Sequence, residues 1–225
     1  MPDMRTTDLN YGEDYFETLD GGLGYQDSTM WEDIAHAVKE VTGYDWVNAQ
    51  DVSGGMSLLD WGCAKGYLVK HLRRRGYEAW GLDISEYAIS HGAPEVADHL
   101  RVFDMTDPGF GTQWEPGYFD VATCFETMEH IPHVVNKKNG HYPTVDAIIH
   151  MRDNLKPGGK LIMTICTEDQ PGWDTDPTHV TIKPYDFWRE LFEGNGFKYD
   201  DATVEHLTKF WLFAYHKGVY AFTRT

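Results

Sequence analysis

The sequence contains few cysteines and no long hydrophobic segment. Its three cysteines, Cys63, Cys124 and Cys166, are odd in number and widely separated, which predicts reduced thiols and no disulfide framework. No apolar run approaches the roughly 20 residues that a membrane-spanning helix needs. Residues 1–5 lack the apolar core of a signal peptide. These absences predict a cytoplasmic protein that does not enter a membrane.

Basic residues are also scarce. The 225-residue chain has 19 lysines and arginines against 36 aspartates and glutamates, which gives a net charge of −17. A field of this sign repels phosphate backbones and therefore disfavours nucleic acid as a partner. The one basic cluster, at 70–75, falls at the end of a predicted helix, where cations interact favourably with the helix dipole. The expected partner is a small-molecule substrate.

The chain shows no linker, repeat or low-complexity segment, and its length suits one sizeable core. Strand and helix patterns alternate, which predicts a doubly wound, Rossmann-like α/β fold with a mostly parallel sheet. The two C-terminal strands predict an antiparallel hairpin at the sheet edge. Strands are predicted at 56–60, 78–82, 100–103, 119–124, 160–165, 198–207 and 219–223, and helices at 28–41, 68–75, 85–89, 144–155 and 184–193.

Residues 1–50 precede this alternation and are predicted to form an N-terminal arm and a helix, with the main domain over 51–225. Three glycines within 21–25 predict a loop there. The arm also carries aromatic side chains, which either pack on the core or cover a ligand as a cap. The sequence leaves both alternatives open for Tyr11, Tyr15, Phe16 and Tyr25.

A glycine-rich turn at 60–66 links the first predicted strand to the helix that follows. Such a junction presents backbone N–H groups and the positive end of a helix dipole to a ligand. A nicotinamide-binding turn would follow Gly-x-Gly-x-x-Gly, but the register that starts at Gly62 places Ala64 and then Tyr67. A pyrophosphate would also sit poorly beside the acid that opens the turn. The turn therefore disfavours a dinucleotide, while Asp83, which ends the second strand, favours a ligand with ribose hydroxyls.

Four segments resemble, in order, the successive motifs of class I S-adenosylmethionine-dependent methyltransferases. These segments are 58–66, 83–85, 119–130 and 155–161. The cofactor-proximal ones are most similar to the ubiquinone-biosynthesis O-methyltransferases. The resemblance implies a seven-stranded sheet with a reversed last strand, in agreement with the alternation above. It also implies that residues 51–225 form the methyltransferase domain, with residues 1–50 as its cap.

Position by position, the resemblance implies that Asp60, Gly62 and Gly66 hold the amino-acid end of the cofactor. Asp83 would accept hydrogen bonds from both ribose hydroxyls. The sequence departs from the family at Ala64, where many members have glycine, but a methyl group there is small. The cofactor-binding residues implied in total are Asp60, Gly62, Cys63, Ala64, Gly66, Asp83, Ile84, Asp104, Met105 and Phe125.

A second group of polar residues follows the fourth strand. If a helical turn begins there, Glu126, Glu129 and His130 share one face, and His179 lies in a later loop at the same edge of the sheet. Two carboxylates and two imidazoles form either a hydrogen-bonded cluster or a divalent-cation site. The pattern is similar to the metal site of small-RNA 2′-O-methyltransferases, which implies Mg²⁺, Mn²⁺ or Zn²⁺ on all four residues. His130, oriented by Glu129, or the nearby His133 is the candidate that accepts the proton of a hydroxyl.

These features predict an S-adenosylmethionine-dependent methyltransferase acting on a hydroxyl of a small molecule, with or without a cation. A sugar, a catechol or another vicinal diol would suit. N- or C-methylation without a metal, RNA 2′-O-methylation and a catalytically inactive cofactor-binding subunit are the alternatives. The RNA alternative shares the cation motif but lacks a basic surface. A homodimer is also left open.

Overall fold

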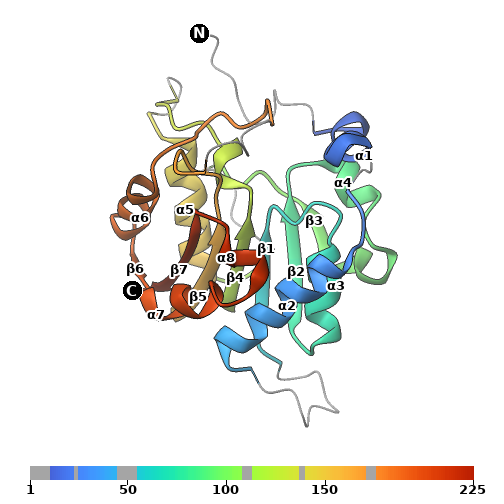
Figure 1. The fold of residues 1–225 in the computed structure, drawn as a ribbon, viewed down its shortest axis with the longest axis horizontal. Coiled ribbons are helices and arrows are strands. Elements are labelled where there is room, and N and C mark those ends of the chain that lie inside the picture. Colours follow the sequence, from blue (N-terminus) through green and yellow to red (C-terminus); the bar gives the residue numbers. More distant parts are fainter. Residues whose placement is uncertain (1–10, 23–24, 45–54, 108–112, 137–139, 171–175) are drawn as a thin grey trace.

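The structure is a computed structural model that describes residues 11–22, 25–44, 55–107, 113–136, 140–170 and 176–225. Within these residues the chain forms a seven-stranded sheet with the order β3-β2-β1-β4-β5-β7-β6 (Figure 1). Every residue of β1 is buried, as expected of a central strand covered on both faces. The strands are β1 Ser57–Trp61, β2 Glu78–Asp83, β3 Leu100–Val102, β4 Phe119–Phe125, β5 Leu155–Thr164, β6 Phe197–Tyr199 and β7 Val219–Arg224.

The predicted mostly parallel sheet with an antiparallel pair at one edge is confirmed. β1 pairs in parallel with β2 and β4, β2 with β3, and β4 with β5. β7 runs antiparallel to both β5 and β6. Ligands bind such sheets outside the carboxyl ends of the strands, where the strand order reverses. Here the order reverses between β1 and β4, so the loops after these two strands lie beside each other.

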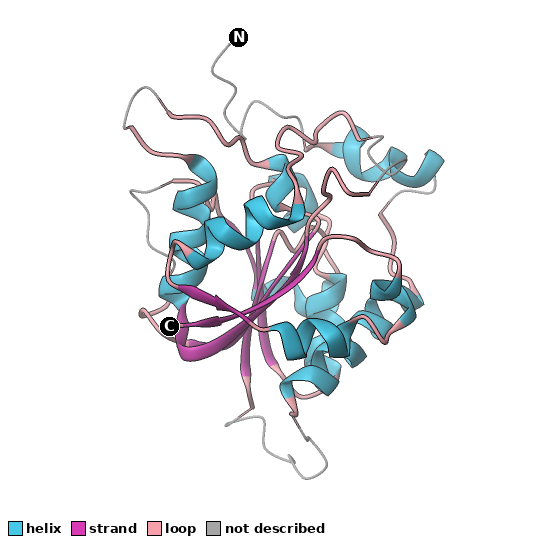
Figure 2. Ribbon diagram, turned by 60° about the vertical axis from the view of Figure 1, so that its left-hand side comes forward, coloured by secondary structure: helices cyan, strands magenta, loops and turns pink. Residues whose placement is uncertain are grey.

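Helices cover both faces of the sheet (Figure 2). One core contains apolar side chains of α5 (Pro143–Asn154) and α6 (Tyr185–Glu193) together with β4 and β5. The other contains those of α2 (Thr29–Thr42), α3 (Tyr67–Arg74) and α7 (Asp201–Leu207). The remaining helices are α1 (Glu13–Gly22), α4 (Glu86–Ser90) and α8 (Trp211–Ala214), with 3-10 turns at Pro94–His99 and Met128–His130.

The strand predicted at 198–207 is wrong beyond its first residues. β6 ends at Tyr199, and Asp200 caps α7, because its Oδ1 accepts the backbone N–H of Thr203 at 3.1 Å. Lys160 Nζ also lies 2.7 Å from Asp200 Oδ2, which fixes the start of this helix against β5. This helix cap outweighs the weak alternation of apolar and polar residues on which the strand prediction rests. The edge strands β6 and β7 pair with each other, but α7 and α8 connect them in the chain in place of a short turn.

Two glycine-containing segments also differ from their predictions. The sequence predicts a loop at 21–25, but α1 includes Gly21 and Gly22 as its last residues. The sequence likewise predicts a break at 156–159, whereas β5 already begins at Leu155. A register shift between β4 and β5 accommodates the proline and glycines there. Glycine and proline are tolerated at the end of a helix and where the hydrogen bonding between two strands is irregular. A local sequence pattern does not reveal such positions.

All three cysteines are free and buried, which agrees with the expectation of reduced thiols. Among the described residues, no helix combines the length and the apolar character that crossing a membrane requires. The predicted domain boundary near residue 50 falls on 45–54, outside the described residues. On the N-terminal side of that boundary, α2 contributes Ile34, Ala35 and Val38 to the same core as Leu58 of β1.

Candidate active site

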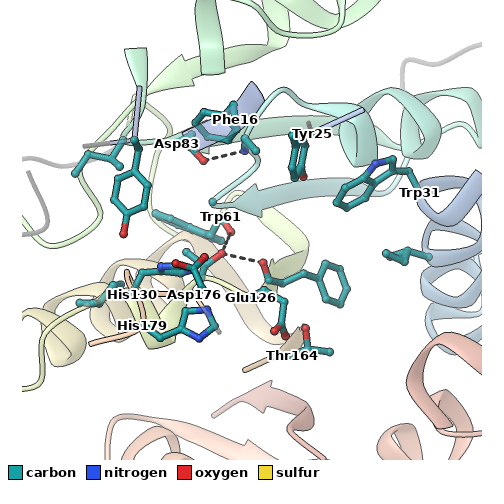
Figure 3. A pocket seen from close by; sticks show the side chains of 18 of the residues that line it. Phe16, Tyr25, Trp31, Trp61, Asp83, Glu126, His130, Thr164, Asp176 and His179 are labelled. Carbon is teal, nitrogen blue, oxygen red and sulfur yellow. Dashed lines mark hydrogen bonds between the residues drawn. The ribbon is translucent and has the colours of Figure 1, made fainter. Parts of the chain in front are cut away.

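The carboxyl ends of β1, β2, β4 and β5 surround a cavity of about 970 Å³ (Figure 3). Loops that follow the strands form one side of it, and α1, α2 and residues 211–216 contribute the other walls. Apolar and aromatic side chains make up most of the lining. A cavity at the upper end of the usual size range has room for a nucleoside-sized ligand together with a second small molecule.

The turn after β1 has a backbone conformation that favours small residues. Gly62 and Gly66 have φ angles of +75° and +72°, and Ala64 has a φ of +48°. A Cβ atom on Gly62 would lie 2.3 Å from Thr127 Oγ1, so no side chain fits between this turn and the loop after β4. The left-handed conformation of Ala64 costs roughly 1–2 kcal/mol. It persists because Asp83 Oδ2 accepts the Ala64 N–H at 2.8 Å.

Asp83 ends β2 and lines the cavity. Its Oδ1 accepts the backbone N–H of Ser85 at 2.8 Å, while Oδ2 accepts that of Ala64. Burial raises the pKa of this carboxyl, and the backbone N–H bonds oppose the rise. A carboxylate has about four lone-pair sites. Asp83 therefore holds the ends of β1 and β2 together and keeps acceptor capacity for a ligand.

Most of the predicted cofactor residues line the cavity, namely Gly62, Ala64, Asp83, Ile84, Asp104, Met105 and Phe125. Asp60, Cys63 and Gly66 do not line it. Asp60 is buried and accepts a hydrogen bond from the Thr123 hydroxyl at 2.7 Å. Burial, helped by the charge of Asp83, raises the pKa of Asp60 to about 7. The motif thus predicts the turn beside the cavity but does not say which of its residues line the cavity.

The polar residues after β4 do not share a helical face. Glu126 has a φ of +47°, and a 3-10 turn over Met128–His130 follows it. This tighter turn directs Glu129 inward, where it is fully buried and its Oε1 accepts the Cys166 N–H at 2.9 Å. Burial and the charge of Glu126 raise the pKa of Glu129 well above its ordinary value. Glu129 thus fixes the end of β5 and does not line the cavity beside Glu126 and His130.

His130 and His179 do come together, and Asp176 joins them. The ligand atoms of these three lie within 4.8 Å of one another, and the described residues form no other such group. The Thr178 hydroxyl donates to Asp176 Oδ1 at 2.6 Å and lies 2.9 Å from His130 Nδ1. Because its single proton goes to Asp176, the Nδ1 of His130 is the donor, and Nε2 keeps its lone pair. Burial and the neighbouring His179 lower the pKa of His130 to about 4.

Asp176 is a site residue that the sequence prediction misses. It precedes His179 by three residues, and its Oδ1 accepts the Thr178 backbone N–H at 2.8 Å. This aspartate-centred turn folds the loop so that Asp176 and His179 approach each other. Tyr15 of α1 donates to the other carboxylate oxygen at 3.2 Å. The local sequence signal for this turn is the Asp-Pro-Thr-His segment at 176–179.

His133 lies outside the cavity. Its ring forms a hydrogen bond with the Thr144 hydroxyl and stacks on Tyr142 at a centroid distance of 4.8 Å. The structure therefore does not bring His133 to the site together with His130. The loop turns away after Ile131, and the alternative proton acceptor of the sequence prediction is packed against α5.

Glu126 forms a pair with His216, a residue 90 positions further along the chain. His216 Nε2 donates to Glu126 Oε1 at 2.9 Å, and the Gly218 N–H donates to His216 Nδ1 at 3.0 Å. The Thr164 side chain forms a further hydrogen bond with Glu126. The partial burial of Glu126 would raise its pKa, but these bonds hold it below its ordinary value. No local sequence signal marks His216, because only the fold brings the C-terminal segment to this loop.

The N-terminal aromatics Tyr11, Tyr15, Phe16 and Tyr25 form part of the cavity wall. Figure 3 shows Phe16 and Tyr25 on the same side of the cavity as Asp83. An ion pair of 2.7 Å between Glu17 and Lys65 ties α1 to the turn after β1. The predicted action of this segment as a cap over a bound ligand stays a prediction.

Known proteins resemble this chain in sequence and in fold. The ubiquinone biosynthesis O-methyltransferase of Azoarcus sp. is 31% identical over 122 residues, or 53% of this chain and 48% of that protein. The enzyme of the same name from Acinetobacter baylyi is 25% identical over 182 residues, or 70% of this chain and 71% of that protein. The chain spans about half the length of several of the curated relatives it matches.

Among solved structures, the geranyl diphosphate methyltransferase in complex with GPP and sinefungin has a similar fold. Its TM-score is 0.52 at 16% sequence identity, covering 84% of this chain and 76% of that one. The family described as a methyltransferase domain matches residues 30–202, which is more than half of the chain. This chain therefore belongs to the methyltransferase domain family, and it has the seven-stranded sheet expected of the class I S-adenosylmethionine-dependent methyltransferases.

Proposed function

We propose that the protein transfers a methyl group from S-adenosylmethionine to a hydroxyl oxygen of a small acceptor molecule. The observation that carries this proposal is one cavity lined both by Asp83 with the turn after β1 and by the imidazole of His130. The relatives named ubiquinone biosynthesis O-methyltransferases favour oxygen as the acceptor atom.

The residues around Asp83 fit S-adenosylmethionine. The remaining acceptor sites of Asp83 suit two ribose hydroxyls, and Ile84 and Met105 offer apolar contacts to a flat adenine ring. Asp104 accepts the Thr106 N–H and hydroxyl on Oδ1 alone, at 2.8 and 2.7 Å, which leaves Oδ2 for the adenine amine. Gly62 allows close approach of the amino-acid end. When bound, the cofactor supplies a methyl group that its sulfonium makes electrophilic.

His130 is the residue that we propose as proton acceptor. An acceptor hydroxyl must lose its proton as the oxygen is methylated, and most of the remaining barrier is a matter of positioning. Asp176 and Thr178 hold the imidazole with Nδ1 protonated and Nε2 available. The low pKa of His130 keeps this ring neutral at physiological pH, so it is ready to accept a proton.

A second candidate mechanism uses a divalent cation on His130, Asp176 and His179. Two imidazoles and a carboxylate suit Zn²⁺ or Mn²⁺, and Thr178 is the kind of outer partner that orients a ligating histidine. A cation there would lower the pKa of a bound hydroxyl. The lone pair of His130 Nε2 serves only one of these purposes, so the two mechanisms are alternatives that an experiment can separate.

The acceptor that fits the rest of the cavity has an aromatic or apolar body. Trp31 from α2, Phe125 at the end of β4 and Phe213 from α8 line this part, and Trp211 at 66% exposure borders it. A sugar would present many hydroxyl groups to this wall, and each unsatisfied one costs free energy. We therefore favour a phenol or catechol over a sugar.

The first test combines binding and turnover. The wild-type protein should bind S-adenosylmethionine in preference to NADH in calorimetry, and should methylate phenolic acceptors in a methyl-donor assay. Replacing Asp83 with alanine should weaken S-adenosylmethionine binding by about 100-fold, because two charge-assisted hydrogen bonds are lost. Asp98→Ala, at an exposed position outside the cavity, is the matched control. Unchanged binding by the Asp83 variant would contradict the cofactor assignment.

Metal removal decides between the two mechanisms. If a cation takes part, dialysis against EDTA should abolish turnover and Mg²⁺, Mn²⁺ or Zn²⁺ should restore it. Calorimetry of the metal-free protein should then show binding of Zn²⁺ or Mn²⁺ that Asp176→Asn weakens at least about tenfold. The exposed Asp186→Asn should bind as wild type does. Full turnover by metal-free protein rules out the cation and leaves His130 as the proton acceptor.

A further inference from the structure

Glu126 has a backbone conformation that the proposed function does not explain. Among the described residues, only Ala64 and Glu126 combine a side chain with a positive φ, and both line the cavity. The conformation of Ala64 belongs to the turn around the cofactor site. Residues held in such unfavourable conformations concentrate at functional sites. The strained backbone of Glu126 directs its side chain toward His216 and Thr164. Figure 3 shows the Glu126 side chain beside Thr164.

The carboxylate of Glu126 is held in place but not saturated. His216 Nε2 donates to it at 2.9 Å. The Thr164 and Glu129 side chains are its further hydrogen-bonding neighbours. A carboxylate has about four lone-pair sites, so acceptor capacity remains. The Glu126 side chain is 47% exposed, and it lines the cavity. The Gly218 N–H donates to His216 Nδ1, which orients the ring so that Nε2 faces Glu126.

The surroundings of Glu126 make a hydrogen-bond donor its suitable ligand. Phe125 and Phe213 line the cavity beside it, and their ring centroids lie 6.1 Å apart. A charged acceptor beside an apolar wall forms stronger hydrogen bonds than it does in water. His130 lines the same cavity. An acceptor molecule with one hydroxyl near His130 can therefore place a second hydrogen-bond donor at the carboxylate of Glu126.

We propose that Glu126 accepts a hydrogen bond from a second hydroxyl of the acceptor molecule, and that His216 is the positioning residue that holds Glu126 for this contact. The inference rests on the proposed function and deepens it, since it specifies a dihydroxy acceptor. It assigns one hydroxyl to the methylation site near His130 and the other to Glu126. It requires no cation between the two hydroxyls.

The test measures binding of matched probes to the full chain saturated with S-adenosylhomocysteine. The probes are tert-butylphenol, tert-butylcatechol and tert-butylhydroquinone, which differ only in the presence and place of a second hydroxyl. EDTA is present, so that no cation bridges two hydroxyls. Wild-type protein should bind at least one of the dihydroxy probes about 10- to 100-fold more tightly than the phenol, as a hydrogen bond to a charged group predicts. Glu126→Met should abolish this preference, and Glu126→Gln should leave part of it.

His216 is tested in the same way. His216→Phe should lose most of the dihydroxy preference although Glu126 is present, and His216→Gln, whose amide can donate to Glu126, should restore it. Glu168→Met, at an exposed position outside the cavity, is the control and should keep the wild-type preference. Equal binding of all three probes by wild-type protein, or a preference that survives Glu126→Met, overturns the inference.

Two further readings separate this inference from the proposed function. Affinity for S-adenosylhomocysteine and the unfolding temperature of each variant show whether the cofactor half is intact. If Glu126→Met does not fold, the comparison of His216→Phe with His216→Gln tests the inference by itself. If wild-type protein methylates the phenol and the dihydroxy probes equally, the inference is wrong and the proposed function stands. If wild-type protein binds no S-adenosylhomocysteine, the proposed function itself is wrong.

Discussion

Replacing His130 with asparagine should lower kcat by a factor of about 10² to 10⁴, the usual contribution of a positioned proton acceptor. Asparagine can still donate to the Thr178 hydroxyl, but it has no basic nitrogen at the position of Nε2. The wild-type rate should also fall as the pH is lowered through about 4, because His130 then becomes protonated. Single-turnover kinetics with S-adenosylmethionine bound isolates this step from product release.

The matched control is His133→Asn, since His133 lies outside the cavity and its hydrogen bond with Thr144 can be reproduced by the amide. This variant should turn over at a rate close to that of wild type. Binding of S-adenosylhomocysteine should be unchanged in both variants. An equal loss of kcat in both, or no loss in His130→Asn, would contradict the assignment of His130 as proton acceptor in the absence of a cation.

Replacing Asp60 with asparagine should stabilise the ligand-free protein at pH 8. Burial, with the charge of Asp83, raises the pKa of Asp60 from 3.8 to about 7. The native state therefore binds the proton more tightly than the unfolded chain, and stability falls as the pH rises from about 4 to about 7. The difference between the two pKa values corresponds to at most roughly 4 kcal/mol of unfolding free energy. Asparagine removes this loss and can still accept from Thr123.

Chemical denaturation between pH 4 and pH 8 measures this effect as the difference between the two proteins. Asp120→Asn is a control of opposite sign. Burial would raise the pKa of Asp120, but Lys156 and Ser57 hold it below its ordinary value. That variant should lose stability at pH 8. If the unfolding free energies of wild type and Asp60→Asn change with pH in parallel, ionisation of Asp60 does not destabilise the folded protein.

The sequence predicts the sheet and its edge pairing well because buried parallel strands leave near-continuous apolar runs bounded by glycines and acids. The same regularity makes the turn at 60–66 recognisable, since positive φ angles at Gly62 and Gly66 restrict the residues that fit. The C-terminal segment is less regular. There the Asp200 cap and its contact with Lys160 stabilise a helix in place of the predicted strand. Lys160 lies forty residues before Asp200 in the chain, so a local pattern does not reveal this contact.

The site follows the same division. By itself the sequence determined the family, the glycine-rich turn after β1, Asp83 at the end of β2 and the presence of His130 and His179 near the cavity. The tertiary structure alone decided that Asp176 joins those histidines, that Glu129 is buried behind the wall and that His216 meets Glu126. The physical reason is the range of the interactions. Backbone geometry and strand burial leave a local pattern in the residues concerned, whereas contacts between distant loops depend on packing that no short segment contains.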